Sequence, residues 1–195
     1  MKICVIHHDP LLQLGIVHAL APHGDVTMHD NAEQCDIVAD TIYIGDYDSG
    51  MALARRFPDH VAHLRKKIII LTYSGRECDA RLALEHGVSA YLLQGCTADE
   101  LVATVRSVQA GLTRIDPSMA KKVAESMFRP KLSTRETQVL GLVAEGLLNK
   151  SIGVGLGIAE DTVKAHLKTI LVKLNAVSRT QAVVLAARRG IIHLD

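Results

Sequence analysis

Aromatic side chains are scarce in this chain. Only 3% of its 195 residues are Phe, Trp or Tyr, and there is no Trp. Because single-stranded nucleic acid is usually bound by stacking its bases on aromatic rings, no such platform is expected. No apolar run approaches the roughly 18 residues that a membrane span needs. The N-terminus also lacks the long apolar region of a secretion signal, so we expect a protein of the cytoplasm with no membrane contact.

Cysteine is also sparse, and the spacing of the four cysteines matches no metal or redox motif. Cys4, Cys35, Cys78 and Cys96 are far apart and form no CxxC pair. For a cytosolic protein we expect four reduced thiols that serve in packing. A disulfide or a redox sensor is the alternative, and the spacing does not favour it.

The composition is that of a globular protein, with 48% hydrophobic and 22% charged residues. The formal net charge of +1 hides an asymmetry. Residues 1–130 hold 13 basic and 16 acidic side chains, whereas residues 131–195 hold 9 basic and 5 acidic ones. A basic C-terminal module that follows a larger acidic one indicates that the C-terminal module binds a polyanion.

The first 111 residues alternate short apolar runs with helical patterns. Five runs read as strands, at residues 2–6, 26–29, 41–44, 68–71 and 90–93. Helical patterns begin near residues 11, 31, 50, 78 and 98. The second is expected to be a short helix over 31–39 capped by Asn31, and the last follows a Thr97–Glu100 capping box. This order predicts an α/β fold, a doubly wound five-stranded parallel sheet with helices on both faces. Ligands of such sheets bind at the carboxyl ends of the strands.

Polar side chains follow four of the five predicted strands. They are His7, His8 and Asp9 after the first strand, Asp46 and Asp48 after the third, Thr72 after the fourth and Gln94 after the fifth. We expect these side chains to meet in one pocket.

Residues 1–111 resemble the receiver domain of bacterial two-component response regulators. The matching segments are VIHHDPLLQLGI, IGDYDSGMALARR, IIILTYSG and ALEHGVSAYLLQG. The resemblance implies strands in flavodoxin-like order. It also implies a pocket with an acid pair for Mg²⁺, a phosphoacceptor Asp, a Thr or Ser and a Lys. Asp46 lies at the phosphoacceptor position, and Thr72 and Tyr91 are retained.

The pocket departs from the receiver pattern at two places. His7 and His8 occupy the positions of the acid pair, with only Asp9 beside them, and Gln94 stands where receivers have Lys. Imidazoles do not provide the oxygen ligands that Mg²⁺ prefers. We therefore predict a pseudo-receiver that serves in dimerisation and protein contact.

Three alternatives remain for this domain. Phosphorylation of Asp46 is the first, and a shifted alignment would select Asp40 instead. A transition metal bound by the histidine-rich first thirty residues is the second. The third is a response to pH through the same histidines.

A linker is expected over residues 112–130, with a short helix over 118–128 capped by Ser118. Residues 131–195 then show four helical patterns. Capping boxes at Ser133 and Ser178 begin the first and the last of them. Asn149 is expected to cap the second, over 150–156. The third, over 160–174, has apolar residues at offsets that describe one buried face.

The second and third helical patterns, joined by a glycine-containing turn, predict a helix-turn-helix. Its second helix would enter the major groove of double-stranded DNA. Lys164, Ala165 and Lys168 are the candidates for base contacts. Three further residues are placed for phosphate contacts, namely Lys150, Thr162 and Lys173. The alternative is a four-helix module whose lysines are merely solvated.

Residues 132–192 resemble the LuxR/NarL-type DNA-binding domain throughout, from LSTRETQVL to AARRGII. The resemblance implies recognition by the third helix and dimer contact through the fourth, at Ala182, Val183, Leu185 and Ala186. Two features are atypical. Ala159 replaces the usual Ser or Thr cap of the third helix, and the second helix carries Gly153 and Gly155.

The sequence therefore predicts a homodimeric transcription regulator of the response-regulator family. An auxiliary protein that pairs with another response regulator is the main alternative, and a histidine kinase is a further candidate partner. A sensor of metal or redox state is favoured only by the early histidines and Cys4. An enzyme is not expected, because no nucleophile lies beside a base and no glycine-rich phosphate loop is present. No cofactor is expected either.

Overall fold

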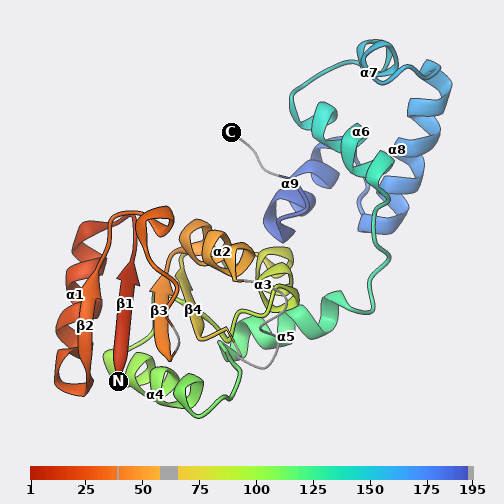
Figure 1. Cartoon of the computed structure of the whole chain (residues 1–195). Coiled ribbons are helices and arrows are strands. Elements are labelled where there is room, and N and C mark those ends of the chain that lie inside the picture. The colour runs from red at the N-terminus through yellow and green to blue at the C-terminus, as the bar shows by residue number, and fades with distance from the viewer. Residues whose placement is uncertain (39, 58–65, 193–195) are drawn as a thin grey trace. The chain divides into compact units, whose positions relative to one another are not determined.

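The computed structural model describes residues 1–38, 40–57 and 66–192. The chain forms two compact units. One spans Met1–Gly75 and Asp79–Lys121, and the other spans Lys122–Asp195 together with Arg76–Cys78. The first unit contains the sheet and the second is helical (Figure 1). The domain boundaries expected at residues 111 and 131 remain a proposal.

The N-terminal unit contains a parallel sheet of six strands in the order β2-β1-β3-β4-β5-β6. Five of them are the predicted strands, and β2-β1-β3-β4-β5 is the predicted order. Their bounds are β1 Lys2–Ile6, β2 Asp25–Met28, β3 Thr41–Gly45, β4 Ile68–Thr72 and β5 Ala90–Leu93.

The sixth strand, β6, was not predicted. It consists of Arg114 and Ile115, which pair with Ala90 and Tyr91 of β5. Two residues are too few to show a period of two, so the sequence pattern could not reveal this strand. Part of the segment assigned to the linker therefore belongs to the sheet.

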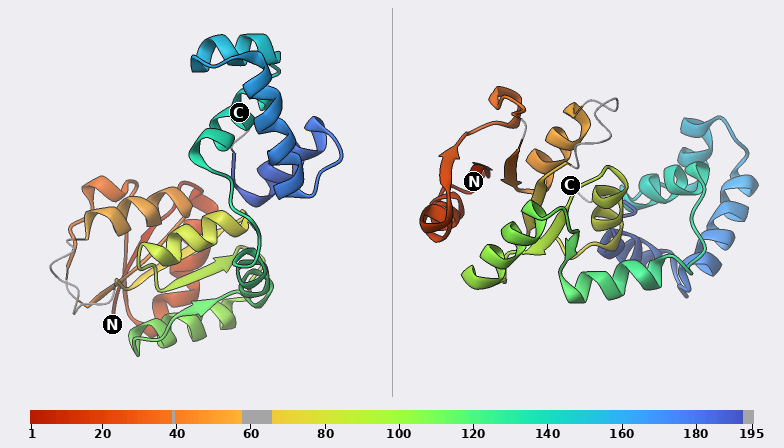
Figure 2. Two further views of the ribbon diagram at one scale, coloured as in Figure 1. Left: turned by 90° about the vertical axis from the view of Figure 1, so that its right-hand side faces the viewer. Right: turned by 60° about the horizontal axis from the view of Figure 1, so that its bottom comes forward.

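Helices cover both faces of the sheet, as predicted (Figure 2). Side chains of α1 (Pro10–Leu20) and α4 (Ala98–Gln109) pack with one set of alternate strand residues, which includes Ile3, Val5 and Ile44. The opposite set includes Cys4 and Tyr43, because neighbouring residues of a strand point to opposite faces. Two further helices are α2 (Tyr47–Arg56), which belongs to this unit, and α3 (Glu77–Glu85), which belongs to it from Asp79 onwards.

Capping residues explain where the first two helices begin. The Asp9 side chain accepts hydrogen bonds from the first turn of α1. The Asp46 side chain caps α2, so this helix begins at Tyr47, three residues earlier than the predicted start at residue 50. The capping box at Thr97 is confirmed.

The helix predicted over residues 31–39 is wrong in length. Asn31 does act as a cap, but only the 3₁₀ turn η2 (Ala32–Gln34) follows it, and Cys35 is already extended. Residue 39 lies outside the described residues.

The predicted linker contains a helix, α5, over Pro117–Ser126 rather than 118–128. Ser118 is not its cap. Asp116 Oδ1 accepts from the amides of Ser118 and Met119, at 2.9 and 3.3 Å. A carboxylate caps a helix well, and Pro117 suits the first helical position, where no amide donor is needed.

The described residues from 131 to 192 form four helices, as predicted. They are α6 (Thr134–Ala144), α7 (Asn149–Leu156), α8 (Glu160–Leu174) and α9 (Arg179–Arg189). Their shared core includes Val139, Leu140, Ile152, Val163 and Ile170. No single helix among the described residues meets the length and hydropathy of a membrane span, and α8 with α9 meets them only as a pair bent by 56°.

The caps of this unit differ in part from the prediction. The capping box of Ser133 and Glu136 is complete. Asn149 does not cap α7 but is its first residue, and Leu148 at the cap position has no side-chain hydrogen bond. Ser178 accepts from the amide of Gln181 at 3.1 Å, but the Gln181 side chain accepts from Val177 rather than from Ser178.

Glu136 also anchors the unit electrostatically. Its buried carboxylate lies 2.7 Å from Lys173 Nζ of α8. Burial alone would raise the pKa of Glu136, but the hydrogen bonds from Lys173 and Ser133 outweigh it and lower the pKa. Lys173 therefore joins α8 to α6, so the phosphate contact predicted for it would have to compete with this ion pair.

We expect Lys173→Met to destabilise the protein by about 1–3 kcal/mol, because it leaves the Glu136 carboxylate buried without its cation. Denaturant unfolding, followed by circular dichroism, measures the difference in unfolding free energy between the variant and wild type. The contribution of Glu136 is present above its unfolded pKa and is lost as pH falls through its lowered folded pKa, so the difference should shrink in acid. Lys168→Met, at an exposed position, is the control and should change little.

The two glycines of α7 provide a second, matched test. A Cβ on Gly153 would lie 2.7 Å from the backbone oxygen of Ile158, whereas a Cβ on Gly155 would meet no neighbouring atom within 4 Å. We expect Gly153→Ala to lower the unfolding free energy by about 1–3 kcal/mol through a forced backbone shift. Gly155→Ala should raise it by up to about 1 kcal/mol. Equal effects of the two variants in thermal unfolding would contradict this account of Gly153.

Candidate functional site

Four of the predicted pocket residues lie together at the carboxyl ends of the strands. His7 and His8 follow β1, Asp46 follows β3 and Gln94 follows β5. The rings of His7 and His8 stack with their centroids 4.8 Å apart. His7 Nε2 lies 3.2 Å from Gln94 Nε2. The parallel order of the strands thus brings these four side chains together, as their places at the strand ends predicted.

Asp46 is buried, and both of its oxygens are engaged. Oδ2 accepts from the His8 amide at 2.9 Å and lies 3.0 Å from His8 Nδ1. Oδ1 accepts from the Ser49 amide at 2.7 Å. Burial alone would raise the pKa of Asp46, but the hydrogen bonds from Ser49 and His8 outweigh it and lower the pKa. The carboxylate is ionised at neutral pH and links β1 to α2.

His7 is buried and neutral, because burial lowers its pKa despite the nearby carboxylate of Asp46. Its Nδ1 accepts from the Asp9 amide at 3.0 Å, so the ring proton lies on Nε2, which faces Gln94. Gln94 Oε1 is buried without a hydrogen-bond partner in the described part of the chain. Half a rotation of the Gln94 amide would bring this oxygen to the Nε2 proton and satisfy both groups.

The remaining candidates of this pocket take part in local structure. Asp9 caps α1, and Thr72 Oγ1 accepts from the Ser74 amide at 3.1 Å. Asp40 precedes β3, at the opposite end of the strand from the pocket, and its carboxylate lies 3.0 Å from Lys67 Nζ. Asp40 is therefore the wrong choice for a residue aligned with the phosphoacceptor.

The donor groups of this pocket do not fit Mg²⁺. His7, His8 and Asp46 offer ligand atoms within 4.8 Å of one another, but two of the three are nitrogens. Mg²⁺ prefers six oxygens, and the one carboxylate is already bound by His8 and Ser49. Gln94 brings no charge that would balance a phosphoryl group.

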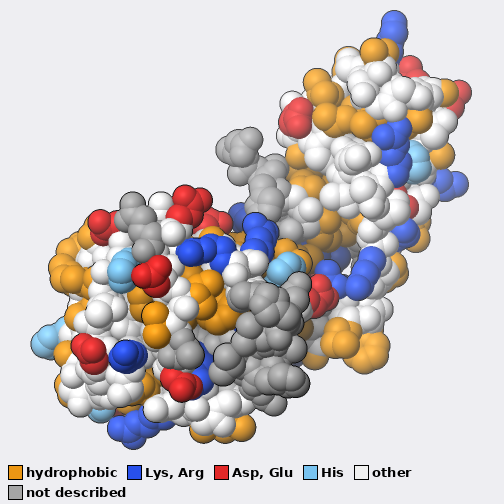
Figure 3. Space-filling view, viewed as in Figure 1, with side chains coloured by type: hydrophobic (Ala, Val, Ile, Leu, Met, Phe, Trp, Pro, Cys, Tyr) orange, Lys and Arg blue, Asp and Glu red, His pale blue; other side chains and the backbone are white. Residues whose placement is uncertain are grey.

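The second candidate site is the outward face of α8 in the C-terminal unit. Ala165 and Lys168 are exposed on this helix, one turn apart, while Val163 and Ile170 are buried on its inner face. Val172 continues the outer face and is 75% exposed. Val172 was not predicted to be part of this face, although its place outside the buried apolar pattern was the available signal. Figure 3 shows Lys and Arg side chains on the surface of this unit.

The turn before α8 fixes how this helix leaves α7. Gly157 is left-handed at φ 66° and ends α7, and the Ile158 amide donates to the Gly153 carbonyl at 2.9 Å. Ala159 precedes α8 without a side-chain cap, as predicted.

Lys164 is exposed but not isolated. Its Nζ lies 3.0 Å from an Asp161 oxygen and 3.3 Å from a Glu160 oxygen, and these hydrogen bonds raise the pKa of Lys164. The spacing of three and four residues predicts such pairs on a helix. Glu160 and Asp161 also lie in the first turn of α8, where their charges suit the helix dipole.

Lys150 in α7 and Thr162 in α8 are also exposed, which suits the phosphate contacts predicted for them. The predicted dimer residues on α9 need a correction. Ala182 and Ala186 are buried in the core of the unit itself. Val183 and Leu185 are half-buried, and Val184, which was not predicted, is 42% exposed.

A family model matches the C-terminal part of the chain, and several known proteins resemble nearly all of it. A family model described as bacterial regulatory proteins of the luxR family matches residues 130–186. The uncharacterized transcriptional regulatory protein YxjL of Bacillus subtilis (strain 168) is 29% identical over 98% of this chain and 97% of its own length. The nitrate/nitrite response regulator NarL of Escherichia coli (strain K12) is 28% identical, over 93% of each chain.

A solved structure of two RcsB dimers bound to two parallel DNAs has the same fold. Its TM-score is 0.65 at 20% sequence identity, and the match covers 96% of this chain and 98% of that one. The fold, the luxR-type helices and the two full-length relatives agree with one another. The chain is a DNA-binding response regulator of the LuxR/NarL family, with a receiver-like N-terminal unit and a luxR-type helix-turn-helix.

Proposed function

We propose that the protein regulates transcription as a homodimer that binds double-stranded DNA through α8, without phosphorylation of Asp46. The absence of phosphorylation is proposed from the hydrogen bonds of Asp46. Both carboxylate oxygens are used by groups of the same unit, and histidines stand in place of acids. A phosphoryl acceptor needs a free oxygen and cations around it.

The DNA-binding part rests on the surface of α8. Lys164, Ala165 and Lys168 share its outward side, where side chains of a recognition helix reach base edges. Thr162 and Lys150 lie near the start of α8 and on α7, where phosphate contacts position such a helix. The ion pairs of Lys164 are exposed, so DNA can displace the two carboxylates at little cost.

The homodimer is proposed from the symmetry of DNA sites. The related structure of RcsB holds dimers on DNA. Two recognition helices about one helical turn of DNA apart would read a palindromic site. Val184 of α9 is exposed and, unlike the buried Ala182 and Ala186, is open to such a contact.

The recognition helix is tested by Lys164→Ala combined with Lys168→Ala. A duplex selected from a random pool by the wild-type protein serves as the target, and fluorescence anisotropy measures affinity at fixed salt. We expect at least about tenfold weaker binding to the selected duplex and relaxed sequence preference, with folding unchanged.

Lys150→Ala is the matched comparison for the double variant. It should weaken binding to selected and random duplexes alike, because a phosphate contact carries no sequence information. It should also reduce the salt dependence of binding. Unchanged sequence preference in the Lys164 and Lys168 double variant would contradict the role of α8.

The state of Asp46 is tested with a small-molecule phosphodonor. We expect no added phosphoryl mass in intact-mass measurements and no change in affinity for the selected duplex. Asp46→Asn, which keeps one oxygen to accept from the Ser49 amide, should bind the duplex like wild type. A phosphoryl mass accompanied by tighter binding, both lost in Asp46→Asn, would favour the conventional switch instead.

A further inference from the structure

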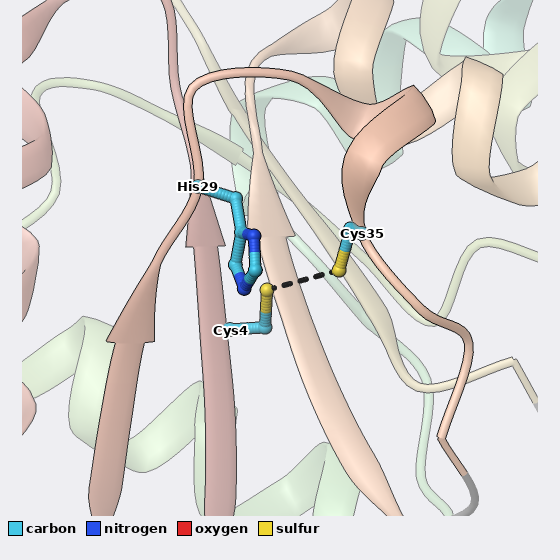
Figure 4. A group of neighbouring side chains, drawn as sticks. All are labelled: Cys4, His29 and Cys35. Atoms are coloured by element: carbon cyan, nitrogen blue, oxygen red, sulfur yellow. Dashed lines mark hydrogen bonds between the residues drawn. The ribbon is translucent and has the colours of Figure 1, made fainter.

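Two cysteines and a histidine that are distant in the sequence lie together in the N-terminal unit. Cys4 is in the middle of β1, His29 follows β2, and Cys35 follows η2. The Sγ atoms of Cys4 and Cys35 are 3.3 Å apart, and the ligand atoms of all three residues lie within 4.8 Å of one another. Figure 4 shows the imidazole of His29 beside the two sulfur atoms.

The sheet register brings Cys4 and His29 to the same face. Cys4 is paired with Thr27 of β2, and His29 lies two residues beyond Thr27. The His29 amide donates to the Val5 carbonyl at 3.0 Å, so the strand geometry continues to this residue. Since strand residues two apart point to the same face, Cys4 and His29 point the same way. Cys35 approaches them from η2.

The cluster is accessible to a small ion although its thiols are buried. Cys4 and Cys35 are each 3% exposed, and His29 is half-buried. All three line one surface pocket, together with Thr27, Asp36 and Tyr43. The pocket also holds Asp25 and Lys2, whose charges are opposite.

We propose that Cys4, His29 and Cys35 form a zinc site with three protein ligands and a fourth position open to water. Thiolate and imidazole are preferred ligands of Zn²⁺, and three protein ligands with one open position are an established coordination. Two thiolates neutralise the charge of the ion, which suits a pocket with buried ligands.

The distances fit with small adjustments. A tetrahedral ion with zinc–sulfur bonds of about 2.3 Å separates two thiolates by about 3.8 Å. The observed 3.3 Å therefore requires the two sulfur atoms to move apart by only a few tenths of an ångström. Cys35 lies outside any helix or strand, so it can supply this movement.

Without metal Cys4 is held as a thiol. Burial and the hydrogen bond with Cys35 raise the pKa of Cys4 to about 12. When Zn²⁺ binds, each thiol gives its proton to solvent and forms a sulfur–zinc bond, so two protons are released for each ion.

The site is tested on the full-length, reduced protein. Zn²⁺ is titrated against a chromogenic chelator, and Co²⁺ is added separately to record the charge-transfer absorption of thiolate-bound cobalt. We expect one ion for each chain and a cobalt–thiolate spectrum. Loss of a group that only supports a metal ligand lowers metal affinity about 10–100-fold. Cys35→Ser and His29→Ala should each lower the affinity for zinc by more than this.

We expect His29→Ala to leave the fold intact, because the hydrogen bonds of His29 to Val5 and Gln13 are made by its main chain. It also separates a metal site from a disulfide, in which His29 would have no part. His23→Ala, at an exposed position, and Cys96→Ser, outside the cluster, are matched controls and should bind zinc like wild type.

Three results would overturn the proposal. The first is zinc binding that is unchanged in both Cys35→Ser and His29→Ala. The second is binding that is lost in His8→Ala but not in His29→Ala, which would assign the ion to the pocket of His7, His8 and Asp46. The third is absence of zinc binding by the reduced protein, with a Cys4–Cys35 disulfide forming in air equally in wild type and His29→Ala.

Discussion

The pairing of β1 with a parallel strand on each side is the constraint on which the N-terminal unit depends. Cys4 of β1 lies opposite Thr27 of β2 and Tyr43 of β3. The same register carries the chain out of β1 directly beside the end of β3, so that the backbone of His8 reaches the carboxylate of Asp46. A shift of one residue would reverse the faces of every β1 side chain and separate both clusters.

The sequence predicted the fold well because its strands are apolar runs and its helices have recognisable caps. The pocket of His7, His8, Asp46 and Gln94 followed from strand ends alone. Cys35 could not be placed, because its position depends on where the 3₁₀ turn η2 stops, and the apolar pattern extended that helix too far. The ion pair of Lys173 with Glu136 could not be predicted for a related reason. The pattern of a helix shows which face is buried, but not which side chain of another helix lies against it.

In the C-terminal unit one carboxylate serves two purposes. Glu136 completes the cap of α6 and holds Lys173 of α8, so the start of one helix and the end of another share a charge. This links the orientation of the proposed recognition helix to a helix on the other side of the core. The left-handed Gly157 and the close approach at Gly153 fix the opposite end of α8.

Lys164 is the residue whose surroundings matter most for how such a protein would search DNA. Glu160 and Asp161 offset its charge locally, so it adds little to the long-range attraction for phosphates. Attraction of that kind drives binding to random DNA. Because these carboxylates are exposed, Lys164 can exchange them for acceptors on DNA only at short range, so we expect it to contribute more to local contacts than to general affinity. The modest basicity of residues 131–195 thus favours short dwell times on non-cognate duplexes over strong non-specific retention.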